Sequence, residues 1–291
     1  MVQKLVRENW CPHMIIVLFF LQLSCSQNAD QAIGLPKHET TIGNAPLTDS
    51  IYVQAFQDLL DSAKLKGCIL IRHQHTFYSN DFQWAQKGQL PASTFKILNS
   101  IIGLELGLIK DTTTIFPWNG QPQMNPNWES DLKLKDAFQL SCVPCYRELA
   151  RQIGLTNMIK YTEIFNYGHL NIDTSNLDLF WLMGDSKISP FEQIQFLRQF
   201  YEHDFSIKVS TYNTMKYILL RECTAPYSLY GKTGWSTDHE HDNTWFVGFA
   251  ETRDKTVYFA TNLEPTEHTD MTNMAQKRIE LTEQALHYIG L

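Results

Sequence analysis

The spacing of apolar residues changes along the chain, and these changes predict its elements. In residues 49–66, apolar side chains recur three and four positions apart, which is the pattern of an amphipathic helix, and Gly67 should end that helix. A short apolar run at residues 68–72, with a polar stretch and a turn at residues 88–91 behind it, predicts one or two strands. Residues 93–108 are apolar nearly all round, which is typical of a buried helix.

The second half of the chain predicts a further helix, a set of strands and a closing helix. Ser189 offers an N-cap that is followed by proline, and Glu192 completes a capping box, so a helix should run from there toward Tyr201. An amphipathic pattern at residues 273–289 predicts the closing helix. Between these helices, three aromatic and β-branched runs separated by polar turns predict an antiparallel meander: residues 228–235, 244–251 and 256–261.

This order of elements favours an α+β fold over alternating βαβ units. We expect an antiparallel sheet flanked by the N- and C-terminal helices, with an all-helical region inserted between the two halves of the sheet. The sheet domain would then take residues 27–86 and 204–291, and the helical domain would take residues 87–203. No internal repeat, low-complexity tract or flexible linker is visible in the sequence.

The first 26 residues have the pattern of an export signal. Basic residues precede an apolar run at residues 14–23, and small residues follow it. Ten such residues are too few to cross a bilayer, which takes about 20 in a helix. We therefore expect an exported mature chain, residues 27–291, without a membrane span. Cleavage before Cys25 would make a lipoprotein instead, but Ser24 and the two residues before it match that signal imperfectly.

Composition and charge narrow the function classes. The 291 residues are 43% hydrophobic and 19% charged, which is enough apolar material for one large or two ordinary cores. A net charge of −7, with no block of basic residues, argues against nucleic acid as a partner. The exported chain keeps four cysteines, for which disulfides and free buried thiols both stay open: Cys68, Cys142, Cys145 and Cys223.

No metal site is expected from the sequence. The C-x-x-C at residues 142–145 lacks both the second C-x-x-C of a zinc site and a thioredoxin-like context. The H-x-H pairs at residues 73–75 and 239–241 lack a recognisable third ligand, and the second pair falls in a polar turn.

Ser93 and Lys96 stand one helical turn apart at the start of the buried helix, so they share a face. A serine hydroxyl is a poor nucleophile until a base takes its proton, and amides at a helix N-terminus favour the negative charge that develops in acyl transfer. The alternative is an N-cap serine with a surface lysine. It is disfavoured because the helix is apolar on all faces and leaves the lysine little water to reach.

Lys232, Thr233 and Gly234 form a second constellation, on the first strand of the predicted meander. Alternation along a strand sends Lys232 and Gly234 to one face and Thr233 to the other. A glycine there lets a ligand approach the backbone. An S-x-x-K followed about 140 residues later by K-T-G is the motif pair of penicillin-recognising serine enzymes.

Five motifs occur in one order along the chain: Pro91-Ala92-Ser93-Thr94-Phe95-Lys96; Ser141-Cys142-Val143; Tyr167-Gly168-His169; Phe180-Trp181-Leu182 with Lys187-Ile188-Ser189 behind it; and Gly231-Lys232-Thr233-Gly234. In this order they resemble the class D β-lactamases, or oxacillinases, over nearly the whole exported chain. The Ser-x-Val motif stands where class A enzymes have Ser-Asp-Asn. One departure is His169, where the family usually has asparagine, and we expect it to affect loop geometry and substrate range.

The resemblance implies a serine β-lactamase that opens the β-lactam amide of oxacillin-type penicillins through an acyl-enzyme. Ser93 would be the nucleophile, and Lys96, carboxylated by carbon dioxide to N6-carboxylysine, would be the general base for acylation and for release. Burial of Lys96 should lower its pKa and leave the amine neutral, as carboxylation requires. The indole N–H of Trp181 would stabilise the carbamate. No other cofactor is implied.

The same resemblance assigns the remaining site residues. Ser141, near Lys232, would pass a proton to the leaving lactam nitrogen, and the backbone amides of Ser93 and Trp235 would hold the oxyanion. Lys232, Thr233 and a helix arginine would meet the substrate carboxylate. The expected substrate contacts are Thr233, Gly234, Arg278, Tyr167, Val143 and Leu182.

Two other functions share these motifs. A penicillin-binding peptidase or a covalent β-lactam sensor would be acylated without rapid turnover. Trp181 and the apolar neighbours of Lys96 disfavour the peptidase, and the absence of several apolar spans from the sequence disfavours the sensor. The expected partners are thus small β-lactams in the periplasm, and a homodimer stays open.

Overall fold

The computed structural model describes residues 49–224, 226–239 and 241–291. The predicted export signal, residues 1–26, and the alternative lipid site at Cys25 lie outside the described residues. Within the described part of the chain, no helix combines the length and the apolar character that crossing a bilayer requires.

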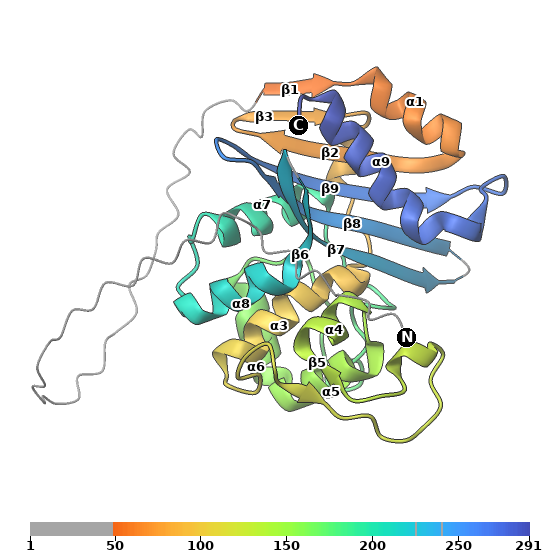
Figure 1. Ribbon diagram of the computed structural model, residues 1–291. Coiled ribbons are helices and arrows are strands. Elements are labelled where there is room, and N and C mark those ends of the chain that lie inside the picture. Colours follow the sequence, from red (N-terminus) through yellow and green to blue (C-terminus); the bar gives the residue numbers. More distant parts are fainter. Residues whose placement is uncertain (1–48, 225, 240) are drawn as a thin grey trace, which may run out of the picture. The chain divides into compact units, whose positions relative to one another are not determined.

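A seven-stranded sheet forms the centre of the fold, in the order β1-β3-β2-β9-β8-β7-β6. All neighbouring strands are antiparallel except β1 and β3, which are parallel. Segments from both ends of the sequence thus lie side by side (Figure 1). The strands are β1 (Asp49–Tyr52), β2 (Leu65–His73), β3 (Thr76–Ser79), β6 (Leu220–Thr224), β7 (Tyr227–Asp238), β8 (His241–Glu251) and β9 (Thr256–Pro265).

Helices cover both faces of this sheet, which is why the middle of β8 is buried along both of its faces. On one face, α1 (Gln54–Ala63) and α9 (Met274–Tyr288) pack together over a core that includes Phe56, Leu60 and Leu286 (Figure 1). The helices of the other face are α2 (Phe82–Gln86), α3 (Lys96–Glu105), α4 (Leu134–Gln139), α5 (Val143–Ile153), α6 (Leu155–Ile164), α7 (Pro190–Tyr201) and α8 (Val209–Leu219). A small two-stranded sheet, β4 (Ile115–Phe116) and β5 (Leu132–Lys133), accompanies them.

The α+β prediction is confirmed, and so are the meander, the closing helix and the capping box of α7. The expected helix over residues 49–66 is wrong at its start, because residues 49–52 pair with β3 as a strand. That helix ends at Ala63, and Gly67 lies inside β2 with φ +135°. A Cβ at Gly67 would meet the Asn262 carbonyl oxygen at 2.1 Å, so this position requires glycine.

The predicted division at residues 87 and 203 stays a prediction, since the described residues all belong to one compact unit. The sheet nevertheless draws its strands from residues 49–79 and 220–265, and the segment between them is mainly helical.

Candidate active site

Ser93 lies in a tight 3-10 turn, η1 (Ala92–Phe95), which leads directly into α3 at Lys96. The turn is held by its own residues and by a distant loop. Thr94 Oγ1 donates to the Pro91 carbonyl at 2.6 Å, and the Ala92 amide donates to the Trp181 carbonyl at 2.7 Å. Ser93 is only 6% exposed, and Lys96 Nζ donates to its Oγ at 2.9 Å. The helical spacing expected from S-x-x-K therefore brings the amine to the hydroxyl.

Lys96 is completely buried at the start of α3. Its Nζ lies 5.2 Å from the ring centroid of Tyr146, and the ring of the preceding Phe95 contacts three aromatic residues: Tyr167, Phe180 and Trp181. Desolvation in these surroundings lowers the pKa of Lys96 to about 7. A much larger share of the Lys96 amine is therefore neutral at pH 7 than of an exposed lysine, which would be almost wholly charged.

Trp181 carries a buried donor that nothing in the described chain satisfies. Its indole is fully buried, stacks on Phe95 at a centroid distance of 5.5 Å, and has an Nε1 with no hydrogen-bond partner among the described residues. Buried donors nearly always have an acceptor. A neutral buried amine and an unsatisfied buried N–H are the features that a carbamate on Lys96 requires, so these residues fit that group.

Ser141 and Lys232 form a second serine–lysine pair. Ser141 lies between α4 and α5 with φ +53°, and Lys232 Nζ donates both to Ser141 Oγ and to the Thr233 carbonyl. Lys232 is 1% exposed, and its pKa lies well below the usual value, first because of desolvation and then because of the neighbouring cations of Lys96 and Arg278.

Strand β7 lies against the nucleophile turn through Gly234. A Cβ at this position would lie 3.2 Å from the Ala92 Cβ and from the Thr94 Cγ2, which is closer than most Cβ contacts. On the other side, Arg278 of α9 donates to the Gly234 carbonyl at 2.6 Å, and its guanidinium lies 5.6 Å from the Trp235 ring. Burial lowers the pKa of Arg278 to about 10, and its Nε has no partner within the described ranges. A buried cation with an unused donor suits an anionic ligand.

The chain is similar to known proteins over most of its length. The family model described as "Penicillin binding protein transpeptidase domain" matches residues 62–281. Beta-lactamase OXA-48 from Klebsiella pneumoniae is 40% identical over 203 residues, which are 69% of this chain and 76% of that protein. The class D β-lactamase structure from Sebaldella termitidis has a TM-score of 0.79 and 31% identity, over 84% of this chain and 98% of that one. The class D enzyme YbXI from Nostoc has a TM-score of 0.77 and 35% identity, over 81% and 98%.

This chain belongs to the class D β-lactamases. The family resemblance seen in the sequence is thereby confirmed. Similarity also extends to the regulatory protein BlaR1 of Bacillus licheniformis, which is 34% identical over 175 residues, although these make up only 29% of that protein.

The other three expected substrate residues of this class D chain are Tyr167, Val143 and Leu182. Tyr167 is buried, and its hydroxyl lies 3.4 Å from Thr94 Oγ1 and 3.5 Å from Gln193 Oε1, beneath the nucleophile turn. These contacts favour a supporting role for Tyr167, so substrate contact stays a prediction for this residue. Val143 is half-buried at the start of α5, and Leu182 is half-buried beside the main core.

Gln193 is a functional candidate that the sequence did not reveal. Its side chain is fully buried in α7, and its Nε2 donates to Thr94 Oγ1 at 2.7 Å. No local pattern marks it, because its partner is 99 positions away in sequence. The nearest signal is the capping box, whose N-cap Ser189 lies four residues before Gln193.

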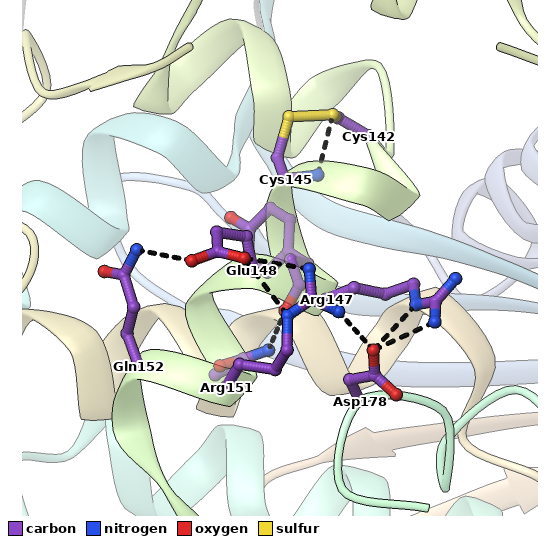
Figure 2. A network of polar contacts seen from close by, with 9 residues as sticks. Cys142, Cys145, Arg147, Glu148, Arg151, Gln152 and Asp178 are labelled. Atoms are coloured by element: carbon purple, nitrogen blue, oxygen red, sulfur yellow. Dashed lines mark hydrogen bonds and ion pairs between the residues drawn. A yellow bond between two sulfur atoms is a disulfide. The ribbon is translucent and has the colours of Figure 1, made fainter. Parts of the chain in front are cut away.

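The structure also shows the surroundings of His169 and of three of the cysteines. The backbone of His169 exchanges two hydrogen bonds of 2.8 Å with Lys187, whereas its side chain is 92% exposed. Cys142 and Cys145 form a disulfide in the first turn of α5, with a Cα–Cα distance of 5.4 Å (Figure 2). Cys68 is a free, buried thiol. In the described ranges, no three His, Cys, Asp or Glu side chains gather as a metal site.

Proposed function

We propose that this protein hydrolyses the β-lactam amide of penicillins, oxacillin included, through an acyl-enzyme on Ser93, with a carboxylated Lys96 as general base. One observation carries the proposal. The Lys96 amine lies 2.9 Å from the Ser93 hydroxyl and is fully buried, with a pKa lowered to about 7. A base beside a serine nucleophile is the arrangement that acyl transfer needs.

The base is proposed to be the carbamate rather than the free amine. Carbon dioxide reacts with neutral amines. Its addition to Lys96 Nζ, with loss of one N–H proton to solvent, would supply an anionic base whose oxygens accept hydrogen bonds. The N–H of Trp181 has no acceptor among the described residues and is the donor that would hold those oxygens. The Tyr146 ring and the aromatic residues around Phe95 keep water from this group.

The other residues divide the remaining tasks. The Ser141 hydroxyl, which accepts a hydrogen bond from Lys232 Nζ, would give its proton to the lactam nitrogen as the amide bond breaks. Lys232 would replace that proton, because its lowered pKa makes it a better acid than an ordinary lysine. The amides of Ser93 and Trp235 would hold the oxyanion, since Gly234 lets β7 lie against the nucleophile turn.

Substrate binding would rest on the charge of Arg278. Penicillins carry a carboxylate, and Arg278 has an unused Nε while its NH1 donates to the Gly234 carbonyl. Thr233 follows Lys232 on the same strand and would add a hydroxyl donor to the carboxylate. The export signal proposed at residues 1–26 would place the reaction in the periplasm.

A second candidate is a sensor that β-lactams acylate without turnover, and the similarity to a regulatory protein favours it. Steady-state hydrolysis of oxacillin and of a chromogenic cephalosporin separates the two. The assay compares wild type, Ser93→Ala and Lys96→Ala, with and without bicarbonate. We expect turnover to fall when carbon dioxide is removed and to return with bicarbonate. We expect both variants to lose it. Stoichiometric acylation of Ser93 without turnover, even in bicarbonate, would mean that the protein is a sensor or a penicillin-binding protein.

A further inference from the structure

The loop that carries Trp181 has little regular structure of its own. Residues 174–185 are turns and bends, and two backbone hydrogen bonds between His169 and Lys187 close the loop at its base. The Trp181 carbonyl accepts from the Ala92 amide in the nucleophile turn. The Trp181 indole is held by packing against Phe95 and Phe180 and by the contacts that fix the rest of the loop.

Two arginines of α5 hold this loop through a single carboxylate (Figure 2). Arg147 brings Nε and NH2 to Asp178 Oδ2 at 3.0 and 2.9 Å, and Arg151 NH1 donates to the same oxygen. The side chain of Asp178 is 16% exposed, so this carboxylate is largely withdrawn from water. Asp178 precedes Trp181 by three residues.

Arg151 is itself held by a neighbour on the helix. Arg151 donates through Nε and NH2 to Glu148 Oε2 at 3.1 and 2.8 Å, and Gln152 donates to the other oxygen of Glu148 at 3.0 Å (Figure 2). The same helix carries Tyr146, whose ring lies 5.2 Å from Lys96 Nζ. Helix α5 thus contacts Lys96 directly and contacts the Trp181 loop through Asp178.

We propose that Arg147 and Arg151 are positioning residues which, through Asp178, hold the Trp181 indole where it can bind a carbamate on Lys96. This inference rests on the carboxylated base proposed above. The arginines do not touch the reacting atoms. Without the carboxylate they would repel each other and release the loop, while the core around Phe180 would keep the chain folded. The loss would appear as a greater need for carbon dioxide.

The test compares Asp178→Asn with Glu148→Gln in the full chain. Both variants exchange a carboxylate for an amide in one network, but Asp178 lies in the loop whereas Glu148 lies on α5. Only Asp178→Asn removes the carboxylate that joins the loop to the helix. Two readouts are taken: the initial rate against bicarbonate, and the carbamate ¹³C signal of the resting protein titrated with labelled bicarbonate. For Asp178→Asn, we expect the half-saturating bicarbonate concentration to rise roughly fivefold in both readouts. The maximal rate at saturating bicarbonate should stay close to that of wild type. Glu148→Gln should shift far less than Asp178→Asn, because it leaves Asp178 and its contact with Arg147 in place.

The inference is overturned if Asp178→Asn titrates like wild type, or if Glu148→Gln shifts as far as Asp178→Asn. Should Asp178→Asn fail to fold, Arg147→Gln and Arg151→Gln carry the same test, because each removes part of the contact with Asp178. A wild-type protein with neither a carbamate signal nor a bicarbonate response would refute the proposed base, and this inference with it. A wild-type response without a variant shift would refute this inference alone.

Discussion

Replacing Lys96 with methionine should stabilise the protein while it abolishes hydrolysis. Burial holds the pKa of Lys96 at about 7 in the folded chain, against 10.5 for an ordinary lysine. At pH 7 the unfolded chain therefore keeps a proton that the folded chain binds weakly. At about 1.4 kcal/mol per pH unit, this costs the folded state about 4 kcal/mol. Methionine removes that cost but also removes the hydrogen bond to Ser93, worth about 1 kcal/mol, so the net gain is about 3 kcal/mol.

The gain in stability of Lys96→Met over wild type should become smaller as the pH rises. Because the pKa of Lys96 is lower in the folded chain, the unfolded chain binds more protons between about pH 7 and pH 10.5. Wild-type stability therefore rises with pH across this window. At pH 9.5 the remaining cost is about 1 kcal/mol, which the lost hydrogen bond offsets. Lys96→Met and wild type should then be nearly equal.

Urea unfolding at pH 7 and pH 9.5, in buffer free of carbon dioxide, measures both values. Lys66→Met is the matched control, because it makes the same exchange at an exposed lysine of β2 and should not reproduce the gain in stability. Adding bicarbonate should stabilise wild type but not Lys96→Met, since only wild type has the amine on which the proposed carbamate would form. A Lys96→Met protein no more stable than wild type at pH 7, or a gain that persists at pH 9.5, would refute the reasoning.

Three further changes have defined outcomes. Trp181→Phe keeps an aromatic ring beside Phe95 but removes the buried N–H, so half-saturating bicarbonate should rise about tenfold or more; an unchanged bicarbonate titration would contradict this role. Arg278→Ala should raise KM for penicillins about tenfold or more with little change in kcat in steady-state kinetics, and the reverse pattern would argue against carboxylate binding. Alanine at both Cys142 and Cys145 should lower the free energy of unfolding by at most about 2 kcal/mol in urea, because the disulfide closes so short a loop, and a larger loss would contradict this estimate.

The fold could be predicted from the sequence where a regular apolar pattern ended at a recognisable cap or turn. Helix α7 begins at the predicted capping box, and the meander strands lie where the aromatic and β-branched runs predicted them. Residues 49–52 show the opposite case. Their apolar spacing continued that of α1, but they pair with β3, a contact that no local pattern encodes. Tertiary pairing decided the structure of this segment, as it often does for short stretches.

Some contacts of the candidate site could likewise be predicted from the sequence, whereas others could not. Ser93 and Lys96 are joined by helix geometry, so their contact follows from the spacing alone. The hydrogen bond between Lys232 and Ser141 spans 91 positions, and the family motif predicted this contact although the local sequence could not. Asp178 has no motif and no periodicity to mark it, and its arginine partners lie 27 and 31 positions away. Such ion pairs become visible only when the chain is folded.

The buried charges explain why this site should favour anions. Lys96, Lys232 and Arg278 are each at least nine-tenths buried, and each has a pKa below its usual value. The causes are burial and neighbouring cations, and for none of the three is an acidic side chain among them. A carbamate on Lys96 would be stabilised by the cation of Lys232, and the carboxylate of a penicillin by Lys232 and Arg278. Each of these anions would raise the pKa of the cations beside it. The excess of buried positive charge between β7, α3 and α9 should therefore favour both formation of the carbamate base and binding of the substrate carboxylate.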